Sequence, residues 1–159
     1  MLASIDHVNL VVNDLDRMIA FYRDALSLEV TKHVTISGEW IDKVVALEGV
    51  RAEVVYLAFP AGPNLELIKY HAPPGAVPTD LDRPNTMGLR HLAFRVDDID
   101  AAYARLSTAG VRLSSDVQRV PDAQVTYSDG VRKRLVYFYD PEGNLLELCE
   151  YKSGKPTDM

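Results

Sequence analysis

The chain has 159 residues, with 17 Lys and Arg against 23 Asp and Glu, and a formal net charge of −6. Apolar residues make up 47% and charged residues 25%, which is the composition of a globular protein and excludes intrinsic disorder. The excess of acidic over basic residues disfavours a nucleic-acid partner. A single cysteine, Cys149, excludes a disulfide scaffold and a cysteine-built zinc site.

No targeting signal is recognisable, and no apolar run approaches the ~18 residues of a membrane span. We therefore expect a cytoplasmic protein with a small-molecule substrate and with neither a membrane nor a nucleic-acid partner.

An internal repeat organises the sequence. His7–Ala20 aligns with His91–Ala104 at an offset of 84 residues (91 − 7), and five of the 14 positions are identical. Asn64–Tyr70 aligns with Leu145–Tyr151 at an offset of 81 (145 − 64), with four of seven positions identical. Such self-similarity indicates two copies of one structural unit.

The first copy predicts a strand, a helix and three further strands, taken in chain order. Alternating and β-branched apolar residues predict the strands, and Asn13 or Asp14 caps a helix that runs to about Ala25. The four expected strands are Ile5–Val12, Leu28–Ile36, Arg51–Phe59 and Leu65–Tyr70.

The second copy repeats this order. Asp98 caps a helix that ends before Gly110, and residues 140–144 form a tight turn. The expected strands are Leu89–Val96, Val111–Val120, Arg134–Tyr139 and Leu145–Tyr151.

The predicted class is α+β, built from two βαβββ modules. We expect one domain over 1–159, with modules at 1–72 and 87–152, a Pro- and Gly-rich linker at 73–86 and a C-terminal tail at 153–159. Sheet edges exposed in so small a unit favour a homodimer.

Each module contributes one histidine from its first strand and one glutamate from its last strand. These residues are His7 and Glu66 in the first module and His91 and Glu147 in the second. A lone histidine or glutamate in a strand is usually structural or solvent-exposed, but duplication of both at matched positions favours a shared site. Two imidazoles and two carboxylates would hold one divalent ion per chain, such as Co²⁺, Ni²⁺, Mn²⁺ or Zn²⁺.

With these four residues in place, the sequence resembles the vicinal oxygen chelate superfamily. That superfamily includes glyoxalase I, methylmalonyl-CoA epimerase, extradiol dioxygenases and bleomycin resistance proteins. The resemblance covers about residues 4–152, and its most specific stretches are IDHVNLVVNDLDRMIAFYRDAL, GLRHLAFRVDDIDAAYARL and YDPEGNLLELCEY. It implies that each module curls into a half-barrel around a metal ion.

The ligand pattern favours the epimerase and glyoxalase branches, because the extradiol enzymes lack a carboxylate where this chain has Glu66. The resemblance implies a metal-dependent epimerase or isomerase that acts through an enediolate on a carbonyl compound of acyl-CoA or keto-sugar type. A lactoylglutathione lyase of the glyoxalase I kind is the alternative. A non-catalytic protein that binds a metal or a small ligand is the third possibility.

Inversion at carbon needs an acid–base group on each face of the substrate. Glu147 is the candidate catalytic base. Glu53, in the predicted third strand, resembles the acid–base carboxylate of the family's epimerases, and its neighbours Val55 and Leu57 suggest that it is buried. A solvent-exposed strand glutamate is the competing interpretation. We expect Glu53 and Glu147 to act on opposite faces of the substrate.

Overall fold

The computed structural model describes residues 1–125 and 127–153, which fall into two compact units divided between Pro78 and Thr79. The boundary between the units falls inside the predicted linker. Of the predicted C-terminal tail only Ser153 is described, and the rest lies outside the described residues.

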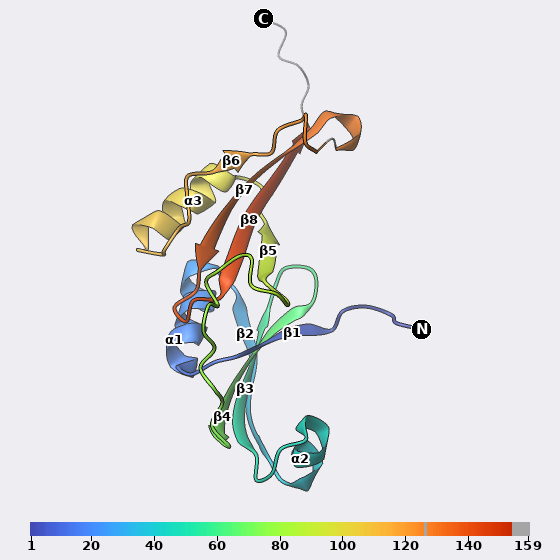
Figure 1. Cartoon of the computed structure of the whole chain (residues 1–159), viewed down its shortest axis with the longest axis vertical. Helices are drawn as coiled ribbons and strands as arrows, with labels where there is room; N and C mark the ends of the chain where they lie inside the picture. Colours follow the sequence, from blue (N-terminus) through green and yellow to red (C-terminus); the bar gives the residue numbers. More distant parts are fainter. Residues whose placement is uncertain (126, 154–159) are drawn as a thin grey trace, which may run out of the picture. The chain divides into compact units, whose positions relative to one another are not determined.

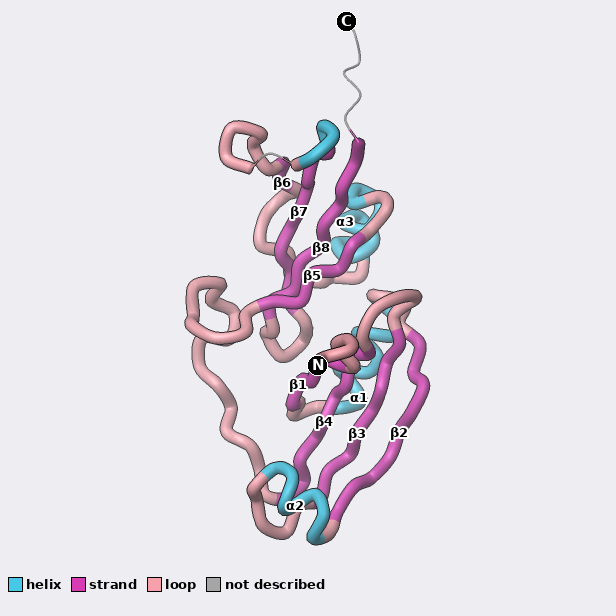
Figure 2. The backbone as a smooth tube through the Cα atoms, turned by 90° about the vertical axis from the view of Figure 1, so that its right-hand side faces the viewer, coloured by secondary structure: helices cyan, strands magenta, loops and turns pink. Residues whose placement is uncertain are grey.

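Unit one contains a four-stranded mixed sheet (Figures 1 and 2). The sheet order is β1-β4-β3-β2, with β1 parallel to β4 and the other neighbours antiparallel. Its elements are β1 (His7–Val11), α1 (Leu15–Ala20) with a π-helical turn (Phe21–Ala25), β2 (Glu29–Ser37), α2 (Glu39–Val45), β3 (Arg51–Ala58) and β4 (Asn64–Ala72).

Unit two repeats the arrangement in the sheet order β5-β8-β7-β6, again with its first and last strands parallel. Its elements are β5 (His91–Arg95), α3 (Ile99–Thr108), β6 (Gln118–Arg119), a 3-10 turn (Ser128–Gly130), β7 (Val131–Tyr139) and β8 (Leu145–Ser153). Each unit is thus a βαβββ module, and the predicted α+β class is confirmed.

Both main helices begin at the predicted aspartates. Asp14 Oδ1 accepts a hydrogen bond from the Arg17 amide at 3.1 Å, and Asp98 Oδ1 accepts one from the Ala101 amide at 3.0 Å. Each bond satisfies an amide of the first helical turn, which has no partner inside the helix.

Two elements differ from the sequence prediction. The segment between β2 and β3 forms α2, because Ile41 packs on the sheet while the residues around it face solvent. The predicted strand Val111–Val120 contracts to Gln118–Arg119 and a single bridge from Leu113 to Phe138.

Strand register separates two faces in each sheet. In unit one, Val55, Leu57, Leu65 and Leu67 share a face on which all four are fully buried, and α1 packs against it (Figure 2). The opposite face carries Tyr56 and its cross-strand partner Glu66. We call this second face the ligand face, and the face with Glu147 in unit two is its counterpart.

Candidate metal centre

Unit one brings His7 and Glu66 together, because β1 and β4 are neighbouring parallel strands. His7 Nε2 lies 3.4 Å from Glu66 Oε2, and the Glu66 side chain is only 10% exposed. The same carboxylate oxygen accepts a hydrogen bond of 2.9 Å from Asn9 Nδ2, whose residue stands directly across from Glu66. Asn9 therefore holds a buried carboxylate in one orientation.

Asp6 sets the orientation of the His7 ring. Its Oδ2 lies 2.8 Å from His7 Nδ1, on the far side of the ring from Glu66. This carboxylate raises the pKa of His7, burial opposes the rise, and Glu66 adds to it. A neutral ring that donates from Nδ1 to Asp6 presents the lone pair of Nε2, which is the arrangement that metal-binding histidines use.

Unit two pairs its own histidine and glutamate in the same way. His91 Nε2 lies 3.2 Å from Glu147 Oε2. The Glu147 side chain is 4% exposed, and its other oxygen forms an ion pair with Lys133 Nζ at 2.7 Å. Burial lowers the pKa of Lys133, but the Glu147 carboxylate outweighs burial and the pKa rises. Lys133 thus compensates the charge of a buried glutamate.

A tyrosine completes each pair, and the sequence prediction missed it. Tyr56 stands directly across from Glu66, and Tyr137 stands across from Glu147. The tyrosine and histidine rings touch, with centroids 5.8 Å apart for His7 and Tyr56 and 5.2 Å apart for His91 and Tyr137. The tyrosines are separated by 81 residues (137 − 56), the same offset as the glutamates, so the repeat already contained this signal.

Each glutamate raises the pKa of the tyrosine that stands across from it. A hydrogen bond to Glu66, together with burial, raises the pKa of Tyr56 to about 12. Burial and the negative charge of Glu147 raise the pKa of Tyr137. Both hydroxyls therefore stay protonated at neutral pH and act as donors.

The donor set fits a divalent cation. Each unit offers one imidazole and one buried carboxylate, and apart from the Lys133 ion pair Glu147 Oε1 has no hydrogen-bond partner among the described residues. Within residues 1–125 and 127–153, no group of three or more histidine, cysteine or acidic side chains is arranged to hold a metal ion. Each unit by itself therefore supplies a pair of ligands.

Glu53 lies away from these pairs. It is three residues from Tyr56 on the same strand, and its cross-strand partners Thr35 and Lys69 place it on the helix-covered face, opposite Glu66. Its neighbours Val55 and Leu57 do share its face, as the sequence suggested, but that face is the core. The expected position of Glu53 beside the metal ligands therefore needs correction.

Two histidines hold Glu53 instead. His71 Nε2 lies 2.6 Å from one carboxylate oxygen, and His33 Nε2 lies 3.3 Å from the other. The hydrogen bond from His71 lowers the pKa of Glu53, burial opposes this effect, and His33 reinforces it. The carboxylate is thus kept charged, whereas a general acid at neutral pH needs a raised pKa.

Comparison with known proteins places the chain in one family. A sequence model of the Glyoxalase/Bleomycin resistance protein/Dioxygenase superfamily matches residues 4–148. The chain belongs to this superfamily, as its resemblance to the vicinal oxygen chelate proteins predicted.

Named relatives include epimerases. The chain is 30% identical to a 2-epi-5-epi-valiolone epimerase from Actinomyces sp. over 98% of this chain and 84% of that protein. It is 26% identical to mitochondrial methylmalonyl-CoA epimerase from Mus musculus, over 92% of this chain and 72% of the other. A glyoxalase family protein from Bacillus cereus has a similar structure, with a TM-score of 0.78, 29% identity and 95% coverage of both chains.

The helices are too short or too polar to cross a membrane in the part of the chain that the structure describes.

Proposed function

We propose that the chain is a metal-dependent epimerase or isomerase that acts through an enediolate on a carbonyl compound of keto-sugar or acyl-CoA type. The observation that carries this proposal is the duplicated pair: each unit sets a histidine beside a buried glutamate on neighbouring parallel strands. The names of two relatives, a valiolone epimerase and a methylmalonyl-CoA epimerase, support the reaction class. A homodimer in the cytoplasm is part of the same proposal.

His7, Glu66, His91 and Glu147 would together hold one Co²⁺, Ni²⁺, Mn²⁺ or Zn²⁺ ion. Bound there, the ion would polarise a substrate carbonyl as a Lewis acid. Asn9 and Lys133 keep the two glutamates oriented, and Tyr56 and Tyr137 donate hydrogen bonds toward them. Within each unit, the polar groups around the histidine and glutamate are therefore in place before a substrate arrives.

Glu147 is the proposed proton acceptor. Its carboxylate removes the proton from the carbon next to the substrate carbonyl, which leaves an enediolate. For inversion a second carboxylate must return a proton on the other face. Glu53, which the sequence suggested for this step, lies on the core face of its sheet.

The position of Glu53 also favours a second candidate function. A lactoylglutathione lyase needs only one carboxylate, which takes a proton from one carbon and gives it to the next. Because Glu53 does not lie on the ligand face, its position is compatible with this one-carboxylate reaction as well as with epimerisation. The two differ in product, since one inverts a centre and the other moves a hydrogen between carbons.

The first test is Co²⁺ binding by calorimetry, and the chain supplies matched controls. It has four histidines, of which His7 and His91 are proposed ligands and His33 and His71 are not. Alanine at His7 or His91 should each weaken Co²⁺ binding by at least ~10-fold, as loss of a ligand does. Alanine at His33 or His71 should leave the affinity and a stoichiometry of about one ion per chain unchanged.

The second test is proton–deuterium exchange by NMR on acyl-CoA, keto-sugar and hemithioacetal substrates with Co²⁺ or Ni²⁺ added. Exchange with inversion supports the epimerase, and hydrogen transfer within the hemithioacetal supports the lyase. Equal Co²⁺ affinity in all four histidine variants would show that the site is misassigned.

A further inference from the structure

The two units differ at one end of their ligand faces, beyond the histidine and glutamate pairs. The repeat offsets of 81 and 84 give the counterparts: Ala52 with Lys133, Ile68 with Cys149, Tyr70 with Tyr151 and Val11 with Arg95. The first member of each pair belongs to unit one. Three of the four positions in unit one are aliphatic, whereas unit two places two cations there.

In unit one this end of the ligand face is closed by packing. Ala52 is fully buried, Ile41 of α2 lies against it, and Ile68 and Tyr70 pack on the same cluster. In unit two the corresponding connection, between β6 and β7, contains a 3-10 turn (Ser128–Gly130) in place of α2. The equivalent positions there carry Lys133 and Arg95 in place of Ala52 and Val11.

In unit two Arg95 and Lys133 converge on one ring. The Arg95 guanidinium carbon is 5.5 Å from the centroid of Tyr151, and Lys133 Nζ is 5.6 Å from it. Tyr127 meets the same ring edge-on, at 5.6 Å.

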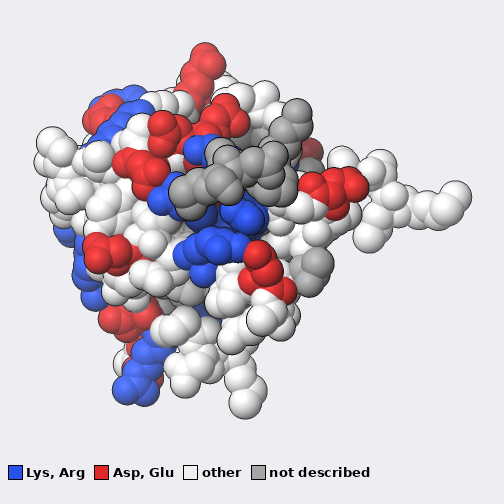
Figure 3. All heavy atoms as spheres, turned by 90° about the horizontal axis from the view of Figure 1, so that it is seen from above, with Lys and Arg blue, Asp and Glu red and all other residues white. Residues whose placement is uncertain are grey.

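These two cations differ in whether a carboxylate already neutralises their charge. Lys133 already pairs with Glu147, and Arg95 is exposed and pairs with no carboxylate among the residues that the structure describes. Two positive groups held near one ring repel each other, and an anion between them would relieve this repulsion. Figure 3 looks down on the end of unit two where β7 starts and β8 ends, and Lys and Arg side chains gather there in one patch.

We propose that Arg95, Lys133 and Tyr151 form an anion subsite on the ligand face of unit two, which takes a phosphate or carboxylate group of the substrate. The guanidinium of Arg95 offers a planar fork to the oxygens, and Lys133 adds a point charge next to Glu147. The inference deepens the proposed function and rests on it, because the bound anion is assigned to the substrate of the proposed reaction. Anion binding itself can be tested separately.

The experiment follows backbone amide shifts by NMR in full-length, metal-free protein at constant ionic strength. Inorganic phosphate and acetate are the two probes, and chloride is the reference. Saturable shifts at Arg95, Lys133 and Tyr151 are expected for at least one probe. Shifts with phosphate alone indicate a phosphate ester, shifts with acetate alone a carboxylate, and shifts with both a general anion subsite.

Arg95→Gln should raise the dissociation constant of the binding probe by at least ~10-fold, as the loss of a charge-assisted hydrogen bond does. Arg132→Gln is the matched control, because Arg132 lies on β7 beside Lys133 but on the opposite face of the sheet. It should bind as the parent does. The subsite is refuted if neither probe shifts these amides, or if both variants bind alike.

Because no metal is present, this titration does not depend on the proposed reaction. Failure of the proposed function would appear as unchanged Co²⁺ binding in the His7 and His91 variants. Failure of the subsite would appear as unchanged anion binding in Arg95→Gln.

Discussion

Glu53 and Glu66 lie on opposite faces of one four-stranded sheet, although apolar residues flank both in the sequence. Glu66 faces His7, whereas Glu53 is held by His71 and His33. Two glutamates with apolar sequence neighbours thus have different roles. Glu66 is a candidate ligand, and Glu53 ties together three strands of the sheet.

Glu53→Gln is therefore expected to leave Co²⁺ affinity and proton–deuterium exchange near the parent values. Glu147→Gln should reduce exchange by ~10²-fold or more, the usual contribution of a general base. Both variants keep the size of the side chain. A loss of exchange in Glu53→Gln with normal Co²⁺ binding would restore the two-base scheme that the sequence suggested.

Stability should reveal the role of Glu53 as a function of pH. Its pKa is lowered in the folded protein from the ordinary value of 4.5, chiefly by the hydrogen bond with His71. The stabilisation is therefore complete above about pH 4.5 and is lost as the pH falls through the lower folded value. The parent should exceed Glu53→Gln by about 1 kcal/mol or less at pH 6, since the pair is partly exposed, and the difference should vanish in acid. Urea unfolding at several pH values measures it.

The position of Glu53 shows what the sequence could not supply. Val54 and Val55 are both apolar, so the two faces of β3 cannot be distinguished by alternation alone, and the register with β2 and β4 is needed. The repeat, by contrast, predicted both helix caps and both histidine–glutamate pairs, because equivalent positions in two copies reinforce each other.

Local packing explains the other differences. The helix α2 has one buried residue, Ile41. A helix of seven residues with one buried position shows too little hydrophobic periodicity to be predicted from the sequence. In the predicted strand Val111–Val120, the polar run Ser114–Asp116 breaks the pairing between Leu113 and Gln118. The offset of 81 residues relates Tyr56 to Tyr137, but only the strand pairing places each tyrosine opposite its glutamate.

Asn9 is expected to support metal binding by Glu66, although Asn9 itself is exposed. Asn9→Ala removes the donor that lies 2.9 Å from Glu66 Oε2. Loss of such a supporting group typically weakens metal binding by ~10–100-fold. Calorimetry with Co²⁺ measures the change, and Asn85→Ala in the linker, which makes the same substitution at an exposed site, should have no effect. Equal affinities in the two variants would count against Glu66 as a ligand.

The tyrosines opposite the glutamates predict a matched pair of effects. Tyr56→Phe and Tyr137→Phe each keep the ring next to a histidine and remove only the hydroxyl that faces the glutamate. Each should lower stability by about 1 kcal/mol, the net value of one hydrogen bond, and both should weaken Co²⁺ binding. Tyr70→Phe is the control, since Tyr70 packs in the apolar cluster beneath α2. Binding is best compared by calorimetry, and a weaker Tyr70→Phe would point to general loosening of the sheet.

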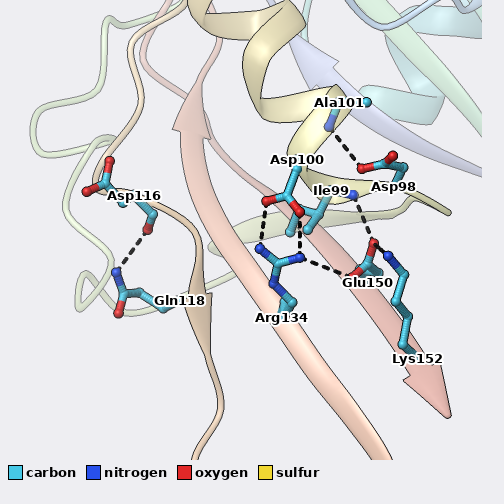
Figure 4. Close-up of polar contacts among 9 residues, drawn as sticks. All are labelled: Asp98, Ile99, Asp100, Ala101, Asp116, Gln118, Arg134, Glu150 and Lys152. Atoms are coloured by element: carbon cyan, nitrogen blue, oxygen red, sulfur yellow. Dashed lines mark hydrogen bonds and ion pairs between the residues drawn. The ribbon is translucent and has the colours of Figure 1, made fainter. Parts of the chain in front are cut away.

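Glu150 lies only three residues from Glu147 but on the other face of β8, where it holds α3 in place (Figure 4). The residue is 1% exposed, and Oε1 accepts the Ile99 amide at 3.0 Å in the first turn of α3. Lys152 Nζ approaches the same oxygen at 2.9 Å, and Arg134 lies 3.6 Å from the other oxygen. Burial alone would raise the pKa of Glu150, but these three partners outweigh it and lower the pKa.

Glu150→Leu should therefore destabilise the protein by about 3 kcal/mol or more, because it leaves a helix amide and an arginine without their buried partner. Glu150→Gln keeps an acceptor for the Ile99 amide and should cost less. The stabilisation by the charged form is complete above about pH 4.5 and is lost as the pH falls through the lowered folded value, so Glu150→Gln should approach the parent in acid. Urea unfolding followed by near-ultraviolet circular dichroism measures these differences. The exposed Glu48→Gln should match the parent at every pH, and a Glu150→Leu protein as stable as the parent would show that α3 is held without Glu150.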